Sequence, residues 1–211
     1  KITHSDMCWE NNNKLKNLKK LVSHVQNNSD IKIGLQISHS GRKGSTELPW
    51  LKPNSTLKKK SWKTLSSSAI KREYDWPTPK EMNLIDIKTV KRKFSITSTL
   101  AKKLNIDCLE LHMAHGYLLH QFFSPISNIR NDKYGGNLKN RCRFLVEVAE
   151  VVRKNWPKNK VLGARITGMD WIKNGLTLKD SIYLTKQLKK IGFDYVCVSS
   201  GGLISKTDFK P

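Results

Sequence analysis

Short apolar runs alternate along the chain with longer amphipathic stretches. Four runs rich in aliphatic residues are typical of buried strands, namely Ile31–Ser38, Asp107–Met113, Val161–Thr167 and Asp194–Ser199. The stretches between them repeat apolar side chains at helical spacing and predict three helices, over Asp86–Lys103, Asn140–Asn155 and Leu178–Ile191. Alternation of strands and helices in this order indicates a parallel sheet with right-handed crossovers.

The faces and ends of these helices can also be predicted. Two sets of residues recur at helical spacing: Leu145, Val148, Val152 and Trp156, and then Ile182, Thr185, Leu188 and Ile191. Thr177 precedes the last helix and has Asp180 three residues later, which is a variant of the capping box. Asn105 and Gly192 end two of the helices at positions that favour a left-handed backbone.

Polar residues near the carboxyl ends of the strands suggest where a functional site would lie. Buried parallel strands should be apolar on both faces. The exceptions are Gln36, Glu110, His112, Arg165, Ser199 and Ser200. In a (β/α) barrel this end of the strands carries the active site. An open doubly wound sheet is the alternative, but no G-x-G-x-x-G turn follows a strand.

The number of strands bears on how much of a barrel is present. A complete barrel has eight strands and typically about 250 residues. Four strands therefore predict the central units of a TIM (β/α)8 barrel, about strands 3 to 6, forming one domain over residues 1–211. A long excursion at 41–87, rich in proline and tryptophan, interrupts the alternation. Connections of this length are usually functional, such as a lid or an interface loop.

A formal net charge of +22 raises the possibility of a nucleic-acid-binding module. Such a module would gather lysine on one face, whereas here lysines are scattered over expected outer helix faces and loops. We therefore expect no specific nucleic-acid partner, only weak attraction to polyanions. No stretch approaches the roughly 20 apolar residues of a membrane span, so no membrane partner is expected either.

The N-terminus and the cysteines provide information on the length of the protein and on its cellular compartment. The chain has no signal peptide and no initiator methionine, which suggests that it starts partway through a longer protein. Its cysteines are Cys8, Cys108, Cys142 and Cys197, and their spacing is not that of a metal site. Apolar surroundings for two of them suit a reducing cytoplasm.

The segment His112–Tyr117 ends a strand and offers three readings. His112 and His115 could ligate a metal with His120 as a third ligand, as in a zinc-dependent hydrolase that also uses Glu110. They could instead donate hydrogen bonds to a carbonyl oxygen and polarise it. They could also be two histidines with only structural partners at a strand end.

Two further polar residues are candidates for contact with a ligand. Arg165 is the only charge in its strand, so it requires a partner, which could be Glu110 or an anionic ligand. Gln36 could read an amide-like edge with one donor and one acceptor. The turn that contains Ser200 and Gly201 could bring backbone N–H groups near the same ligand.

At these residues the chain resembles a known family. LELHMAHGYLLHQFFSPISNIRNDKYGGNLKNRCRFL, over Leu109–Leu145, resembles the signature stretch of the Old Yellow Enzyme family of NAD(P)H:flavin oxidoreductases. IGLQISHSGRKGS, over Ile33–Ser45, resembles its third strand, and LGARITG and YVCVSSGG its fifth and sixth. The bacterial branch of xenobiotic reductases and NADPH dehydrogenases is the most similar. The resemblance runs through nearly the whole chain in order.

The resemblance implies an FMN cofactor in a TIM barrel, with NAD(P)H as reductant. It places Gln36 at the pyrimidine edge of the flavin and Arg165 near flavin N1, where a cation favours the reduced state. Ser200 and Gly201 complete the expected cofactor contacts. The family's first strand would precede Lys1, and its seventh and eighth strands, which bind the FMN phosphate, would follow Pro211.

The same resemblance assigns the substrate side. His112 and His115 are expected to bind the oxygen of an unsaturated carbonyl or nitro compound, with Met113 and Ala114 between them lining the substrate. Tyr117 stands where several relatives have the proton donor to the α-carbon. No metal is expected. The expected activity is an ene-reductase, possible as a homo-oligomer, that passes hydride from NAD(P)H through FMN to an activated C=C bond.

Overall fold

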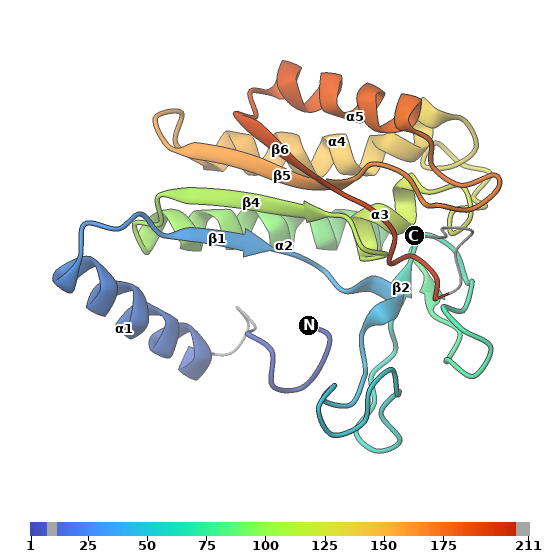
Figure 1. Ribbon diagram of the computed structural model, residues 1–211, viewed down its shortest axis with the longest axis horizontal. Coiled ribbons are helices and arrows are strands. Elements are labelled where there is room, and N and C mark those ends of the chain that lie inside the picture. The colour runs from blue at the N-terminus through green and yellow to red at the C-terminus, as the bar shows by residue number, and fades with distance from the viewer. Residues whose placement is uncertain (8–11, 206–211) are drawn as a thin grey trace.

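The structure is a computed structural model that describes residues 1–7 and 12–205, so Cys8 lies outside the described residues. Its elements are α1 (Asn12–Asn28), β1 (Gly34–Ile37), the 3-10 helix η1 (Gly41–Lys43), β2 (Leu65–Ser66), β3 (Lys80–Glu81), α2 (Leu84–Lys103), β4 (Cys108–Met113), α3 (Leu118–Phe123), α4 (Leu138–Asn155), β5 (Val161–Thr167), α5 (Leu178–Ile191) and β6 (Tyr195–Ser199). Figure 1 shows β1, β4, β5 and β6 side by side. No helix in these ranges is long and apolar enough to cross a membrane.

All neighbours in the main sheet are parallel, in the order β1-β4-β5-β6. The register sets Gln36 beside Glu110, and His112 beside Arg165. Each strand ends at the same edge of the sheet, so the polar strand ends gather there. The prediction of parallel strands joined by helical crossovers is confirmed.

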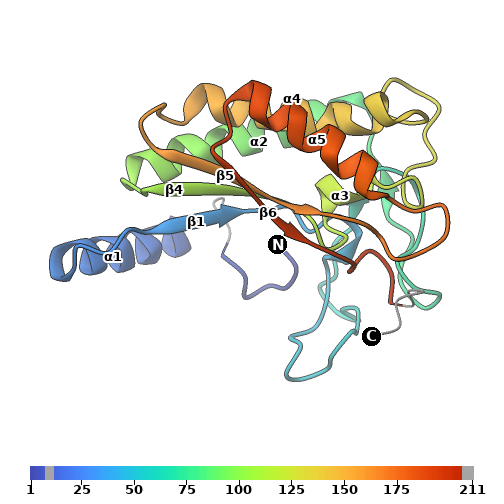
Figure 2. The same cartoon turned by 45° about the horizontal axis from the view of Figure 1, so that its top comes forward.

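The sheet has two different faces. Helices α2, α4 and α5 cover one of them (Figure 2). Side chains on that face are fully buried, among them Leu109, Leu111, Leu162 and Ala164. The other face carries the polar residues, because successive side chains of a strand point to opposite sides. In a barrel this second face is the interior, and its carboxyl end is where the candidate site forms.

The predicted boundaries agree closely with the structure. Val161–Thr167 and Leu178–Ile191 are confirmed as predicted, and the other predicted strands and helices differ by at most three residues at an end. Thr177 donates to Asp180 from both its backbone N and its Oγ1, at 2.8 Å each. Asn105 and Gly192 adopt positive φ angles of 55° and 94°, so both left-handed helix ends are confirmed.

One helix face differs from its predicted position. The prediction for α4 is confirmed, with Leu145, Val148 and Val152 fully buried. In α5 Leu188 is buried, as the predicted stripe requires, but the side chains buried with it are Ser181 and Leu184, while Ile182 is 54% exposed. Several apolar spacings fit this short helix. Crossing α4 selects the stripe through Leu184 and turns Ile182 to solvent.

Other elements were not predicted from the sequence. Helix α1 is rich in asparagine and lysine, and only Leu18 and Val22 among its described apolar residues are buried. Helix α3 is six residues long and buried on every side, so it shows no amphipathic period. Within the excursion, the short strands β2 and β3 pair in parallel, and Thr46 bridges to Thr56.

Candidate functional site

The loop after β4 is held in a strained turn that fixes the predicted site. His115 and Gly116 have positive φ angles of 55° and 72°. Gly116 packs so closely on Gly202 and Leu203 that a Cβ there would overlap their backbone. Glycine is therefore required at this close approach. The turn brings His112, His115 and Tyr117 to the carboxyl edge of the sheet.

The two histidines form a directed chain of hydrogen bonds. Ala114 N donates to His112 Nδ1 at 3.1 Å, so the proton of a neutral His112 lies on Nε2. His112 Nε2 stands 3.2 Å from His115 Nδ1, and His115 Nε2 stands 2.6 Å from Ser199 Oγ. With both rings neutral, each donates from Nε2. A ligand oxygen could accept the hydrogen bond from His112 Nε2–H in place of His115 Nδ1.

Electrostatics keep these rings neutral. Burial lowers the pKa of His112 to about 4, with the charges of His115 and Arg165 adding to the effect. Burial, Arg165 and Lys43 also lower the pKa of His115. An extra proton on either ring would add positive charge beside a fixed cation. Near neutral pH both side chains are therefore uncharged N–H donors.

Tyr117 lies against the first histidine at the start of α3. Its ring packs edge-on against that of His112 with centroids 4.7 Å apart. The Nζ of Lys43 stands 5.1 Å from the Tyr117 ring centroid. Burial raises the pKa of Tyr117, although nearby Arg72 acts to lower it. The hydroxyl therefore keeps its proton at neutral pH.

His120 and Gln121 of α3 stabilise the strained turn through hydrogen bonds to Gly116. The fully buried His120 accepts from Gly116 N at its Nδ1, at 2.8 Å, and its Nε2 lies 2.8 Å from Asp170 Oδ1. Gln121 Nε2 donates to Gly116 O at 2.6 Å. Burial raises the pKa of Asp170, but bonds from His120, Leu176 N and Ser124 outweigh it and lower the pKa overall.

These bonds bear on the hypothesis of a metal. Both nitrogens of His120 have protein partners in this structure, and so does Nδ1 of His112. Among residues 1–7 and 12–205, no group of three or more histidine, cysteine, aspartate or glutamate side chains is arranged to hold a metal ion. His120 acts here as a support for the loop.

Below the histidines, a polar layer crosses the inner face of the sheet. Gln36 Nε2 donates to Glu110 Oε1 at 2.6 Å, and Tyr195 OH donates to Glu110 Oε2 at 2.9 Å. The Tyr195 ring lies over Gly163, where a Cβ would overlap it. Both oxygens of Glu110 thus have neutral partners. The pairing of Glu110 with Arg165, one of two options from the sequence, is not the arrangement in the structure.

Arg165 is left without an internal partner at the level of the histidines. Its Nε is buried and has no hydrogen-bond partner among the described residues. A buried donor atom without an acceptor is costly, so the site has a donor ready for a bound ligand. Beside it, Gly201 has a φ of 68° and open space where a Cβ would stand. Ser200 is exposed at the same strand end.

The structure adds a residue that the sequence analysis missed. Lys43 Nζ donates to His115 O at 2.8 Å and to Gly202 O at 3.1 Å, and so ties the turn after β4 to the turn after β6. Burial lowers the pKa of Lys43 to about 8, helped by the charges of Arg72 and Arg42. Its position directly after a predicted strand, in the run Gly41–Lys43, was the available signal.

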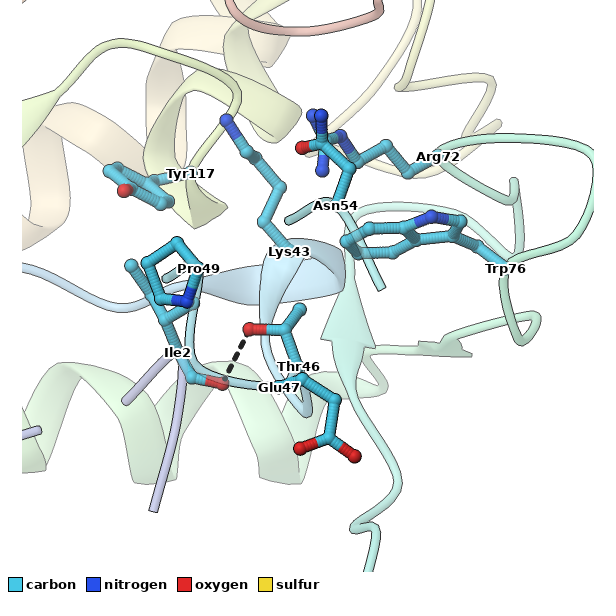
Figure 3. Close-up of a pocket in the computed structure, with 9 residues that line it drawn as sticks. All are labelled: Ile2, Lys43, Thr46, Glu47, Pro49, Asn54, Arg72, Trp76 and Tyr117. Carbon is cyan, nitrogen blue, oxygen red and sulfur yellow. Dashed lines mark hydrogen bonds between the residues drawn. The ribbon is translucent and has the colours of Figure 1, made fainter. Parts of the chain in front are cut away.

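Two cavities border this region. One, of about 170 Å³, lies beside Tyr117 and the excursion (Figure 3). The other, of about 610 Å³, runs along β1 and past Gln36 towards the edge of α2. Only the smaller one includes a residue of the His112–Tyr117 segment.

Comparison with known proteins decides the family. The profile of the NADH:flavin oxidoreductase / NADH oxidase family matches residues 1–209. The chain belongs to this family. It is 36% identical to NADH:flavin oxidoreductase FG08077 of Gibberella zeae, over 98% of this chain and 54% of that protein. It is 37% identical to the NADPH dehydrogenase of Geobacillus thermodenitrificans, over 97% of this chain and 55% of that protein.

Solved structures confirm the barrel fold. The chain superposes on morphinone reductase in complex with tetrahydroNAD with a TM-score of 0.74, at 23% identity, over 89% of this chain and 54% of that one. For a complex of 2-naphthoyl-CoA reductase the TM-score is 0.75, at 24% identity, over 90% of this chain and 29% of that one. The Old Yellow Enzyme resemblance and the barrel prediction are thus confirmed. The chain spans about half the length of the curated relatives it matches.

Proposed function

We propose that this chain supplies the substrate-binding half, and part of the cofactor contacts, of an FMN-dependent NAD(P)H oxidoreductase. Its substrates are unsaturated carbonyl or nitro compounds, reduced at the activated C=C bond. The observation that carries the proposal is one juxtaposition. His112, in register with Arg165 on the next strand, and His115 in the loop that follows are two neutral imidazole donors, and the buried Nε of Arg165 has no acceptor among the described residues.

The residues present fit a flavin. Arg165 offers an unused buried donor, which suits the electron-rich N1 and C2 carbonyl of the ring. Gln36, from the neighbouring strand, offers an amide to the pyrimidine edge once it turns from Glu110. Gly201 has open space where a Cβ would stand, and Ser200 before it is exposed, so both can approach a ligand. When bound, FMN supplies hydride to the substrate after it has been reduced by NAD(P)H.

On the substrate side, side chains of this protein polarise the carbonyl or nitro group and protonate the α-carbon. His112 and His115 donate from Nε2 to the carbonyl or nitro oxygen, which takes the place of His115 Nδ1 and Ser199 Oγ as acceptor and draws electron density from the β-carbon. Ala114 N fixes the tautomer of His112 that can donate. Tyr117 holds a proton on its hydroxyl, because burial raises its pKa, and passes it to the α-carbon. Met113 and Ala114 carry the backbone between the two donors.

The cofactor part is tested by Arg165→Met. The flavin-loaded protein should show oxidised-flavin absorbance, and the variant should retain less flavin and reduce it more slowly. Lys154→Met, at an exposed position on α4, is the matched control. Equal flavin content and equal reduction rates in both variants would remove Arg165 from the site.

The substrate part is tested by His112→Ala and His115→Ala. Loss of one oxyanion-type donor costs roughly 10²–10³ in rate, so enone reduction should fall by about 100-fold or more in each. NADPH oxidation with a small electron acceptor should survive. Loss of activity on chelation, with recovery on adding zinc, would favour the hydrolase alternative and sink this one.

A further inference from the structure

The cavity beside Tyr117 is lined by basic side chains from the excursion. Figure 3 shows the Lys43 and Arg72 side chains in the upper part of the view, and Asn54 also lines the cavity. Trp76 and Tyr117 form aromatic walls on opposite sides. Glu47 is the carboxylate among the lining residues, and its oxygens point away from both cations in this view.

Positive charge accumulates around this cavity. Burial, with the charge of Arg72, lowers the pKa of Arg42 to about 10, and Lys43 falls to about 8 for similar reasons. Burial also lowers the pKa of Arg72, although Glu73 opposes the change. Three cations packed this closely repel one another in a partly desolvated place. A bound anion would relieve that repulsion.

The three cations differ in how far their donors are used. Arg42 donates to the carbonyls of Ile70, Lys71 and Leu203 at 3.1–3.2 Å. Lys43 donates to two carbonyls across the neighbouring loops. The Nε of Arg72 is buried without a hydrogen-bond partner among the described residues.

Arg72 is nevertheless held in place. Its guanidinium stacks on Trp76 at 4.6 Å from the ring centroid, and its Nε forms an ion pair with Glu73 Oε1 at 3.7 Å, a distance too long for a hydrogen bond. A stacked, oriented guanidinium that makes no hydrogen bond among the described residues is suited to bidentate binding of a carboxylate.

Size and position identify the ligand group. At about 170 Å³ the cavity is smaller than the roughly 300–1,000 Å³ of pockets that enclose a whole drug-sized ligand. It therefore fits one small substituent. Tyr117 joins the cavity to the histidine pair, because its ring lines the cavity and also packs on His112.

We propose that this cavity is a specificity subsite that binds the carboxylate of the substrate through Arg72, with Lys43 completing the positive field. The preferred substrates are then unsaturated carbonyl compounds that carry a second, anionic group. The inference deepens the proposed function and rests on it. Asn54 adds a neutral amide to the lining of the same cavity.

The test compares one enone with and without charge, 4-oxopent-2-enoate and its methyl ester, in the flavin-loaded enzyme. Arg72→Gln removes a hydrogen bond between two charged groups, so it should lower kcat/KM for the acid about 10- to 100-fold. The ester should change by no more than about 3-fold, since it lacks the charge. Arg72→Lys should restore part of the loss. Lys52→Gln, an exposed charge on the same excursion, should change neither.

A second readout does not depend on catalysis. Calorimetric titration with levulinate, the saturated analogue, should give weaker binding in Arg72→Gln than in the parent protein. If the protein reduces neither enone, the proposed function fails, and this titration still decides whether the cavity binds carboxylates. Equal levulinate binding in parent and variant would overturn the subsite. So would a rise in KM for NADPH but not NADH, because it would assign the cavity to the coenzyme phosphate.

Discussion

At the scale of single residues, Gly163 sets the floor of the site. The Tyr195 ring lies over this glycine and reaches Glu110, which in turn holds Gln36. Burial and the bonds to Cys108 and Glu110 raise the pKa of Tyr195, so its hydroxyl donates to the carboxylate. The absence of one side chain thus allows a bond between β6 and β4 that spans β5.

Gly163→Ala should therefore destabilise the protein. Its new Cβ overlaps the Tyr195 ring, and overpacking of this kind costs typically about 1–3 kcal/mol. Gly34→Ala is the matched control, because a Cβ there would meet only Cys108 Cβ at an ordinary 3.9 Å. Urea unfolding of both variants measures the difference. Equal stabilities would show that the Tyr195 ring can move aside without loss.

His112 provides a prediction for pH dependence. Its pKa in the fold, about 4, lies below its ordinary 6.5, so between these values the unfolded chain binds a proton that the folded chain does not. The free energy of unfolding should therefore fall as the pH falls from about 6.5 towards 4. Above pH 6.5 the contribution of His112 is fully present.

His112→Gln should flatten this part of the profile, because the variant has no ring to protonate. The measurement is the free energy of unfolding at several pH values through that window. His24→Gln, at an exposed position on α1, serves as control and should follow the parent curve. Parallel curves for parent and His112→Gln would mean that His112 is protonated alike in both states.

At the scale of elements, burial decides what a helix tolerates. Leu184 of α5 is fully buried, whereas Ile182 is 54% exposed. Leu184→Ala should cost about 2–5 kcal/mol, as for other large-to-small changes in cores. Ile182→Ala should change stability by less than about 0.5 kcal/mol. Thermal or urea unfolding compares the two, and the reverse ranking would restore the stripe first predicted through Ile182.

The sequence predicted secondary-structure boundaries best for continuous apolar strands and for helices with one apolar face. Val161–Thr167 could be placed to the residue because it is a continuous apolar run broken by one charge. Helix α1 escaped prediction because its polar composition hides a weak apolar stripe. Helix α3 escaped because burial on all sides leaves no period to detect.

The residues of the candidate site also differ in how far the sequence could predict them. His112, His115 and Tyr117 are local in sequence, so a motif could reveal them. The contacts of Lys43 with His115 and Gly202, and the grouping of Arg42, Lys43 and Arg72, join segments far apart in the chain. A single sequence does not indicate that these segments are in contact. The contact becomes visible only in the folded structure of the excursion.

At the scale of the whole molecule, net charge predicts weak binding to polyanions. With a net charge of +22, the chain should bind duplex DNA non-specifically, with Kd values of about 10⁻⁴–10⁻⁶ M at physiological salt. Affinity should fall steeply as salt rises. Fluorescence anisotropy with two unrelated duplexes checks this, and a preference above about 10-fold for one of them would revive the nucleic-acid hypothesis.

The anchoring of His115 also has a consequence for biosynthesis. Its ring bonds Ser199, 84 residues further along, and Lys43 reaches Gly202, 159 residues away. A ribosome that adds about 5–20 residues per second releases the strained turn several seconds before these partners. During that interval the nascent chain can form the strand β4 but not the geometry of its loop. The site is thus completed only when β6 and the turn after it emerge.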